Sequence, residues 1–225
     1  MATTKPHYKY LAVFDFDSTL IDAEIIDELA NIAGVGAIVS KMTRQTVSGE
    51  IPFDEALHQR CELLEGVTVQ DCMLLGDRIK PMANAASTLE FLKSHGFYIA
   101  IASASLNPVA ARAASRRDFS AVDQFIFNHL RVANGKLTGD VDVRVADKGQ
   151  VVFKLQQELG IPKSHTMTVG DGSNDLAMFA ESGLSIAFNA KEIAKKAATK
   201  VVDGKDVGKI IPVVEEWLAA KANAK

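Results

Sequence analysis

The sequence has few cysteines, no long apolar run and no excess of positive charge. Its two cysteines, Cys61 and Cys72, are too few for a disulfide framework and lack metal-ligand spacing, so we expect buried thiols. No apolar stretch approaches the roughly 18 residues of a membrane-spanning helix, and residues 1–10 lack the apolar segment of a secretory signal. Lys and Arg number 25 against 28 for Asp and Glu, which does not give the basic surface typical of nucleic-acid binding. These absences predict a cytoplasmic protein that binds neither membrane nor nucleic acid.

The composition is that of a folded domain, because 48% of the 225 residues are apolar and 24% are charged. Four apolar segments of strand length each end at a polar residue, and segments of helical character separate them. This alternation is typical of a doubly wound, Rossmann-like α/β fold, in which parallel strands carry functional side chains to one edge of the sheet. The predicted strands are residues 10–14 before Asp15, 98–102 before Ser103, 166–169 before Asp171, and 184–188 before Asn189.

Two segments interrupt the alternation. Residues 125–132 and 137–143 flank an Asn-Gly pair, the strongest short-range signal for a tight turn, so we predict a β-hairpin there. Residues 21–79 show helical spacing of apolar residues over several short stretches. We therefore predict a helical-bundle cap at 21–79, over the carboxyl edge of a core formed by residues 1–20 and 80–225.

The first predicted strand ends at two carboxylates, Asp15 and Asp17. Both point the same way if the extended backbone continues past the strand. A metal-bound carboxylate stays ionised and can attack, whereas a neighbour that is off the metal and repelled by that charge keeps its proton and acts as an acid. Such a pair by itself is more often a solvated acidic turn, so its interpretation depends on the other strand ends.

A second group of oxygen ligands follows the third predicted strand, in the segment Gly-Asp-Gly-Ser-Asn-Asp at residues 170–175. Together with Asp15 it forms an oxygen-rich site, which favours magnesium over zinc. An EF-hand loop is excluded, because Leu176 stands where that loop requires glycine.

Ser103 and Lys148 add anion-binding groups at the same edge. The Ser103 hydroxyl and backbone N–H can contact an anion, and Lys148 supplies positive charge for a phosphoryl group, with Asp175 as its counter-ion. A single serine or lysine would mean little. Their occurrence in order with the two acidic segments predicts phosphate-monoester hydrolysis through an aspartyl-phosphate.

The four motifs resemble those of the haloacid dehalogenase superfamily of phosphohydrolases, from residue 14 to about residue 190. Within that superfamily, residues 15–24, 26–30, 135–139 and 170–179 are similar to the phosphoserine phosphatase family. The resemblance implies a Rossmann-like core with a helical cap, magnesium as the cofactor and a role in serine biosynthesis.

The resemblance also implies individual roles. Asp15 is the expected nucleophile and Asp17 the general acid and base. The implied magnesium ligands are Asp15, the backbone carbonyl of Asp17, and Asp171, with Asp175 in support. The implied substrate-binding residues are Glu24, Phe53, Arg60, Ser103, Ala104, Lys148 and Asn174.

The expected substrate carries charges besides its phosphate. Phosphoserine has an ammonium and a carboxylate group, so a dedicated site should offer an acid and a base from the cap. Glu24 and Arg60 stand at the matching positions, and Phe53 is the expected apolar cap residue. The predicted partner is therefore a small phosphorylated metabolite, bound by a monomer or homodimer.

Three positions depart from the family pattern. Ser103-Ala104-Ser105 replaces the usual Ser-Gly-Gly, Val47 replaces a common methionine, and His129 replaces a common arginine. A related phosphatase or phosphotransferase for another small phosphorylated metabolite therefore stays an alternative. A receiver-like phospho-aspartate switch is an alternative of another class, but such a switch needs neither a cap nor Asp17.

Overall fold

A seven-stranded sheet forms the centre of the computed structural model, which describes residues 8–47 and 50–223 but not the side chains of Val47 and Phe53. The strand order is β4-β3-β2-β1-β5-β6-β7, and neighbours are parallel except in the β3–β4 hairpin. The strands are β1 Tyr10–Phe14, β2 Phe97–Asn107, β3 Gln124–Ala133, β4 Lys136–Asp142, β5 Thr166–Gly170, β6 Leu184–Phe188 and β7 Lys200–Val202.

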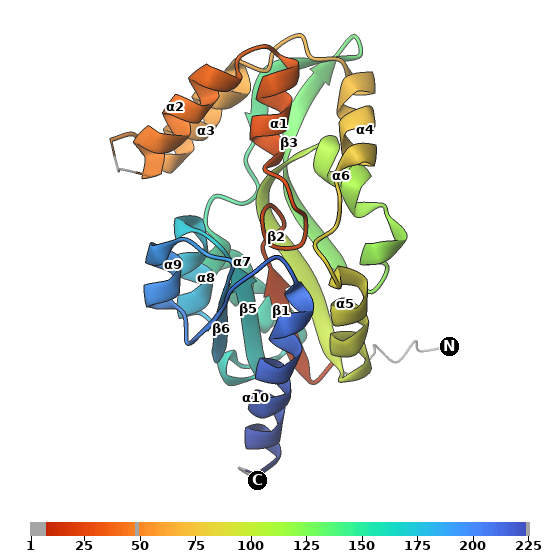
Figure 1. The fold of residues 1–225 in the computed structure, drawn as a ribbon, viewed down its shortest axis with the longest axis vertical. Coiled ribbons are helices and arrows are strands. Elements are labelled where there is room, and N and C mark those ends of the chain that lie inside the picture. The colour runs from red at the N-terminus through yellow and green to blue at the C-terminus, as the bar shows by residue number, and fades with distance from the viewer. Residues whose placement is uncertain (1–7, 48–49, 224–225) are drawn as a thin grey trace.

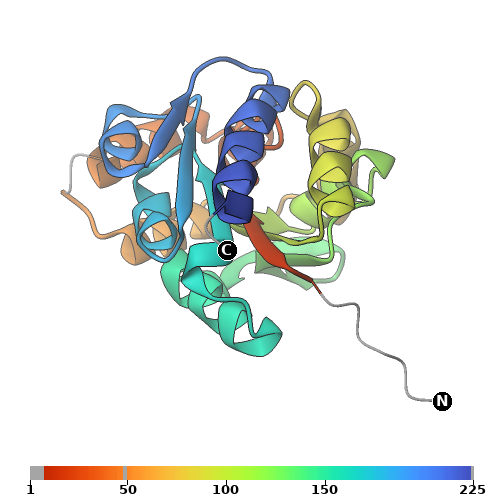
Figure 2. The same ribbon diagram turned by 90° about the horizontal axis from the view of Figure 1, so that it is seen from below.

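The central strand β1 is buried on both faces. Tyr10, Ala12 and Phe14 face one apolar layer, and Leu11 and Val13 face the other, as the period of two in a strand requires. Helices α5 and α10 lie on one side of the sheet and α7 on the other (Figure 2). The predicted doubly wound α/β fold is thus confirmed. The layers contain α5 Ala85–Ser94 and α10 Ile211–Asn223 on the first face, and α7 Lys148–Leu159, α8 Leu176–Ala180 and α9 Glu192–Ala197 on the second.

Four helices between β1 and α5 lie beyond the carboxyl end of β1 (Figure 1). They pack on one another and on the far end of the hairpin, where the N–H groups of Gly66 and Val69 donate to the carbonyls of Leu137 and Gly135. Helix α4 also packs on α6, Val109–Ala114. The division into a core and a cap domain stays a prediction. The four helices are α1 Ile25–Ile32, α2 Gly36–Val47, α3 Phe53–Glu62 and α4 Val69–Arg78.

The predicted hairpin is present, and its turn has the expected geometry. Asn134 and Gly135 both have positive φ, at 51° and 74°, as a two-residue turn of this kind requires. Among the described residues, no helix is both long enough and apolar enough to cross a membrane.

Strand β2 differs from the prediction. It does not end before Ser103 but continues to Asn107, and α6 begins only at Val109. Ser103 pairs with Phe127 and Leu106 pairs with Asn128, so β2 uses two more residues than β3 between these pairs. Such a bulge bends a strand and re-aims its side chains, and sequence alternation alone does not reveal it.

Candidate active site

Asp15 lies at the carboxyl end of β1, next to β5 and to the start of α7. Its backbone N–H donates to the carbonyl of Val169 on β5, and its Oδ1 accepts from the N–H of Phe16 at 2.7 Å. Its Oδ2 lies 2.8 Å from Nζ of Lys148, at the start of α7. The other partner of Lys148 is Asp175, at 2.6 Å. The predicted counter-ion is therefore in place, and one buried ammonium joins two buried carboxylates.

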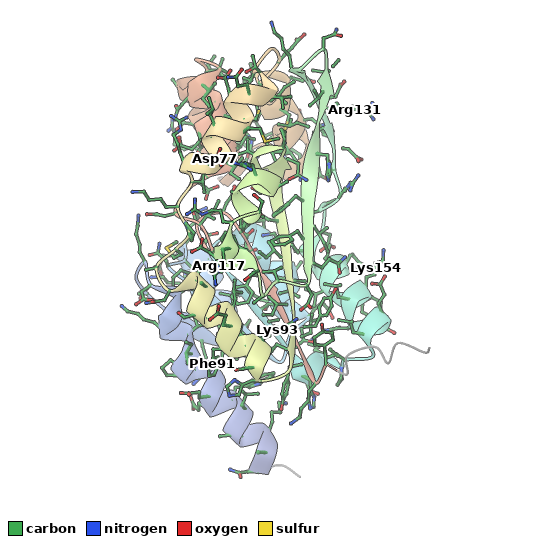
Figure 3. The ribbon with its side chains drawn as sticks, turned by 90° about the vertical axis from the view of Figure 1, so that its right-hand side faces the viewer. Asp77, Phe91, Lys93, Arg117, Arg131 and Lys154 are labelled. Carbon is green, nitrogen blue, oxygen red and sulfur yellow. The ribbon has the colours of Figure 1, made fainter. Side chains whose placement is uncertain are left out.

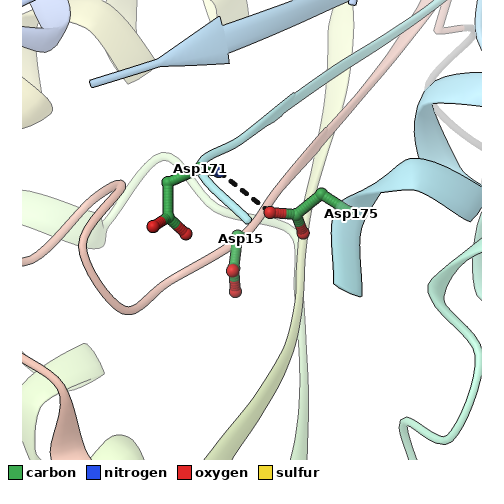
Figure 4. Close-up of side chains that lie close together, drawn as sticks. All are labelled: Asp15, Asp171 and Asp175. Carbon is green, nitrogen blue, oxygen red and sulfur yellow. Dashed lines mark hydrogen bonds between the residues drawn. The ribbon is translucent and has the colours of Figure 1, made fainter. Parts of the chain in front are cut away.

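Asp175 shapes the loop after β5. Its Oδ2 accepts from the N–H groups of Asp171 and Gly172, each at 2.9 Å. A Cβ added to Gly170 would lie 2.3 Å from Cγ of Asp175, so this close approach requires glycine. Asp175 thus supports the loop, while the carboxylate of Asp171 extends from it toward Asp15 (Figure 4).

The acidic groups here fit a hard divalent cation. Asp15, Asp171 and Asp175 each offer a carboxylate oxygen, and these atoms lie within 4.8 Å of one another. The pKa of Asp171 is raised to about 6, because burial disfavours its charged form and the negative charge of Asp15 repels it. Asp175 accepts three hydrogen bonds, two of them from the loop that it supports, whereas the carboxylate of Asp171 extends from that loop toward Asp15, so Asp15 and Asp171 could hold the cation with Asp175 in support.

Asp17 lies beside this centre, with both side-chain oxygens bonded. Its Oδ2 accepts from the N–H of Ile25 at 3.0 Å, and its Oδ1 accepts from the hydroxyl of Ser105 at 2.8 Å. Burial and the charges of Glu24 and Asp15 raise the pKa of Asp17 well above its ordinary value. A carboxyl group in this environment can hold a proton, as general acid catalysis requires.

The bulged part of β2 forms another part of the cavity wall. Ser103, Ala104 and Ser105 line the same cavity as Asp15 and Asp17. Ser103 is buried, and its hydroxyl accepts from the N–H of Ser105 at 3.2 Å. The structure therefore brings the predicted anion-binding serine next to the predicted nucleophile.

Two residues of opposite charge line the cavity, Glu24, the residue before α1, and Arg60 from α3. Glu24 accepts from the hydroxyl of Ser18 at 2.7 Å, and burial raises its pKa. Arg60 donates to the carbonyl of Ala56 and to the hydroxyl of Thr43, and burial lowers its pKa. Within residues 8–47 and 50–223, neither charged group has an ion-pair partner. Both are therefore available to a charged ligand.

Of the other residues singled out in the sequence, only some lie at this cavity. Asn174 lines the cavity beside Ser173. The side chains of Phe53 and Val47 lie outside the described residues. His129 instead pairs with Asn107 near a separate surface pocket, away from the carboxylates.

Among the polar residues at the site that sequence reasoning missed, three contact a predicted carboxylate. Ser18 binds Glu24, Ser105 binds Asp17, and Lys191 lies 3.6 Å from the carboxylate of Asp171. The sequence showed Ser105 only as a departure from a family motif. The other two carried no signal of their own, because a single serine or lysine is common in any sequence.

This arrangement belongs to a known class of hydrolases. A model of haloacid dehalogenase-like hydrolases matches residues 11–183, so the chain belongs to that family. Within the family it is similar to phosphoserine phosphatases. The protein of that name from Archaeoglobus fulgidus is 41% identical over 193 residues, covering 84% of this chain and 55% of its own length. The phosphoserine phosphatase of Methanocaldococcus jannaschii is 35% identical, with coverage of 92% and 98%.

Solved structures show the same similarity. One described as a phospho-aspartyl intermediate analogue of phosphoserine phosphatase has a TM-score of 0.85 and 35% identity, covering 92% of this chain and 99% of that one. A substrate-bound phosphoserine phosphatase complex has a TM-score of 0.84 and 35% identity, with coverage of 91% and 98%. The predicted family and the prediction of a phosphoric monoester hydrolase are confirmed.

Proposed function

We propose that this chain is a magnesium-dependent phosphomonoesterase that hydrolyses O-phosphoserine to serine and phosphate. The observation that carries the proposal is a pair of opposite charges, Glu24 and Arg60, that lie in the same cavity as Asp15 and have no ion-pair partner among the described residues. Phosphoserine would bring an ammonium to Glu24 and a carboxylate to Arg60. The product, serine, fits a role in serine biosynthesis, and the similarity to phosphoserine phosphatases supports the same substrate.

Substrate binding would relieve a cost that the free protein carries. A charge removed from water without a partner is unfavourable, and a charge-assisted hydrogen bond contributes about 1.5 to 3 kcal/mol. Since the Asp15 centre recognises what all phosphate monoesters share, discrimination among them depends on Glu24 and Arg60.

In the first step, a carboxylate oxygen of Asp15 attacks phosphorus while the bond to the serine oxygen breaks. Asp17 gives its proton to that leaving oxygen, so serine departs as a neutral alcohol. Lys148, the hydroxyl of Ser103 and the N–H of Ala104 would stabilise the phosphoryl oxygens, which is supported by their position beside Asp15. An acyl phosphate on Asp15 results.

In the second step, Asp17 takes a proton from water, whose oxygen attacks the phosphorus of the acyl phosphate. The bond between phosphorus and the Asp15 oxygen breaks, which releases phosphate and restores the carboxylate. Both steps require Asp17 beside the reacting oxygen, consistent with its two fixed hydrogen bonds.

The residues that would hold magnesium are Asp15, Asp171 and the backbone carbonyl of Asp17. When bound, the ion would neutralise negative charge on the carboxylates and on the phosphoryl group.

A substrate panel tests the proposal. The expected order of kcat/KM is phosphoserine above glycerol phosphate and sugar phosphates, with free phosphate measured over many turnovers. Glu24→Gln and Arg60→Ala should each lower kcat/KM for phosphoserine by roughly tenfold or more, and affect p-nitrophenyl phosphate much less, because that ester lacks both charged groups.

Matched controls exist on α1 and α2. Glu28→Gln on α1 and Arg44→Ala on α2 remove equivalent charges from exposed positions, and both should retain the preference for phosphoserine. A higher kcat/KM for the phosphate ester of an uncharged alcohol than for phosphoserine would disprove the proposed substrate but not the reaction class. A single burst of phosphorylation without turnover would instead favour the phospho-aspartate switch.

A further inference from the structure

Ser105 contacts the proposed general acid directly. The residue is 4% exposed, and its hydroxyl donates to Oδ1 of Asp17 at 2.8 Å. The other oxygen of Asp17 accepts from the N–H of Ile25 at the start of α1. The carboxyl group of Asp17 is therefore held between the core strand β2 and a cap helix, and Ser105 is its only side-chain partner within the described residues.

The position of Ser105 is built into the fold. It lies in the β2 bulge, and the fully buried Asn128 on β3 holds that bulge by donating to the carbonyl of Ala104 at 3.2 Å. The amide oxygen of Asn128 accepts from the N–H groups of Arg144 and Val145, at 2.8 and 2.9 Å. Because both ends of the amide are bonded, Asn128 fixes the bulge relative to the segment that leads to Lys148.

We propose that Ser105 is a positioning residue, whose hydroxyl orients the carboxyl group of Asp17 for proton transfer to the leaving oxygen. This inference rests on the proposed function, in which Asp17 is the general acid. Because a carboxyl oxygen keeps acceptor capacity when the group is protonated, Oδ1 of Asp17 can accept from the Ser105 hydroxyl in both protonation states. With Ser105 as a constant donor, the proton of Asp17 is directed away from Ser105 and stays available to the leaving oxygen.

The proposal predicts a dependence on the leaving group. The alkoxide of serine needs a proton to depart, but p-nitrophenolate does not. Ser105→Ala should therefore lower kcat/KM for phosphoserine by about tenfold, a part of the 10²- to 10⁴-fold that general acid catalysis supplies. Its kcat/KM for p-nitrophenyl phosphate should stay within about twofold of wild type, since kcat/KM reports only steps up to departure of the leaving group.

A double-mutant cycle tests whether Ser105 acts through Asp17. In the Asp17→Asn background, adding Ser105→Ala should cause no further loss with phosphoserine, because the proton transfer is already absent. Ser87→Ala on α5 is the matched control, since it removes a serine hydroxyl from an exposed position. Thermal unfolding of every variant shows that each is folded.

Three results would overturn the proposal: equal losses with both esters, a change in KM alone, or full additivity with Asp17→Asn. A wild-type enzyme that prefers another alkyl phosphate would refute the proposed substrate only. The same comparison with that alkyl phosphate would then still support or overturn the role of Ser105.

Discussion

Lys148 determines the charge balance of the buried centre. It is 3% exposed and lies within 3 Å of carboxylate oxygens of both Asp15 and Asp175. Burial alone would lower its pKa, but the charges of Asp15 and Asp175 outweigh burial and raise the pKa of Lys148 above its ordinary value. The lysine therefore remains charged, and removing it would leave two buried carboxylates facing each other.

We expect Lys148→Met to lower the free energy of unfolding by about 3 to 5 kcal/mol, the usual effect of breaking a buried pair. Lys154→Met is the control, because Lys154 extends from the outer side of α7 and its side chain is 77% exposed (Figure 3). Lys154→Met should change the free energy of unfolding by no more than about 0.5 kcal/mol. Urea unfolding at pH 7 measures both, and equal stability of the two variants would contradict the expectation.

Asp15→Asn tests covalent catalysis. The amide keeps the size of the side chain but cannot attack phosphorus, so turnover should fall by roughly 10³-fold or more. Phosphate release gives the rate, and mass spectrometry of acid-quenched enzyme should show a phosphoryl adduct on the wild type and none on the variant. Near-normal turnover in Asp15→Asn would disprove the mechanism.

At the scale of elements, the sequence predicted those with a strong periodic or turn signal. Helical segments within residues 21–79, the turn at Asn134 and the strand at residues 184–188 are all present. The bulge in β2 and the hydrogen bond from Ser105 to Asp17 were not predictable, because both depend on register against β3 and on a partner 88 residues away. The strand β7 is only three residues long, too short to stand out as a periodic pattern.

Gly139 on β4 tests the contact between the hairpin and α3. It has a φ of 86°, and an added Cβ would lie 3.1 Å from Cα of Glu62. Gly139→Ala should therefore destabilise the fold by about 1 to 2 kcal/mol from backbone strain alone, and further from the close contact. Gly135 also has a positive φ, but a Cβ added there would meet nothing within 4 Å. Gly135→Ala should therefore destabilise the fold less than Gly139→Ala. Thermal melts compare the two, and a reversed order would show that this contact is unimportant.

The two cysteines report on α3 and α4. Burial raises the pKa of Cys61 to about 12 and that of Cys72 to about 11, so both are neutral thiols at pH 8. We expect a thiol-specific disulfide reagent to label them slowly in the native protein and rapidly in urea. Rapid labelling of the native protein would show that these helices do not stay packed.

The raised pKa values of the two thiols make the stability of the fold depend on pH. A free cysteine has a pKa of about 8.5, and burial raises the pKa in the folded state. The stabilisation by the neutral thiols is therefore complete below about pH 8.5 and decreases as pH rises toward the folded-state values. Urea midpoints from pH 7 to 10 should fall less in a variant with both cysteines replaced by alanine.

On the scale of the whole molecule, charge is distributed unevenly. The net charge is only −3, yet Asp15, Asp17, Glu24, Asp171 and Asp175 gather at one end of the sheet. The clustering of the four aspartates could be inferred from the strand ends, whereas Glu24 was expected there only from the family resemblance. The order of the strands in the sheet could not be inferred from the sequence, because it depends on which crossover connections the chain forms between parallel strands.

Magnesium should raise the stability of the entire fold. A ligand that binds only the native state at 100 times its dissociation constant adds about 2.7 kcal/mol, and Tm should rise accordingly. Asp171→Asn should remove most of that rise, because it removes a carboxylate from the site. Calorimetry with sodium chloride at matched ionic strength is the control, and an unchanged Tm in magnesium would contradict the proposed cation site.

The central place of β1 has a consequence for synthesis on the ribosome. This strand is among the first residues made, but its neighbour β5 follows about 150 residues later, roughly 8 to 30 s at ordinary translation rates. Until then, the apolar residues of β1 have only β2 beside them. The nascent chain therefore exposes a strand edge that invites aggregation, and a chain ending before residue 166 should need a chaperone to stay in solution.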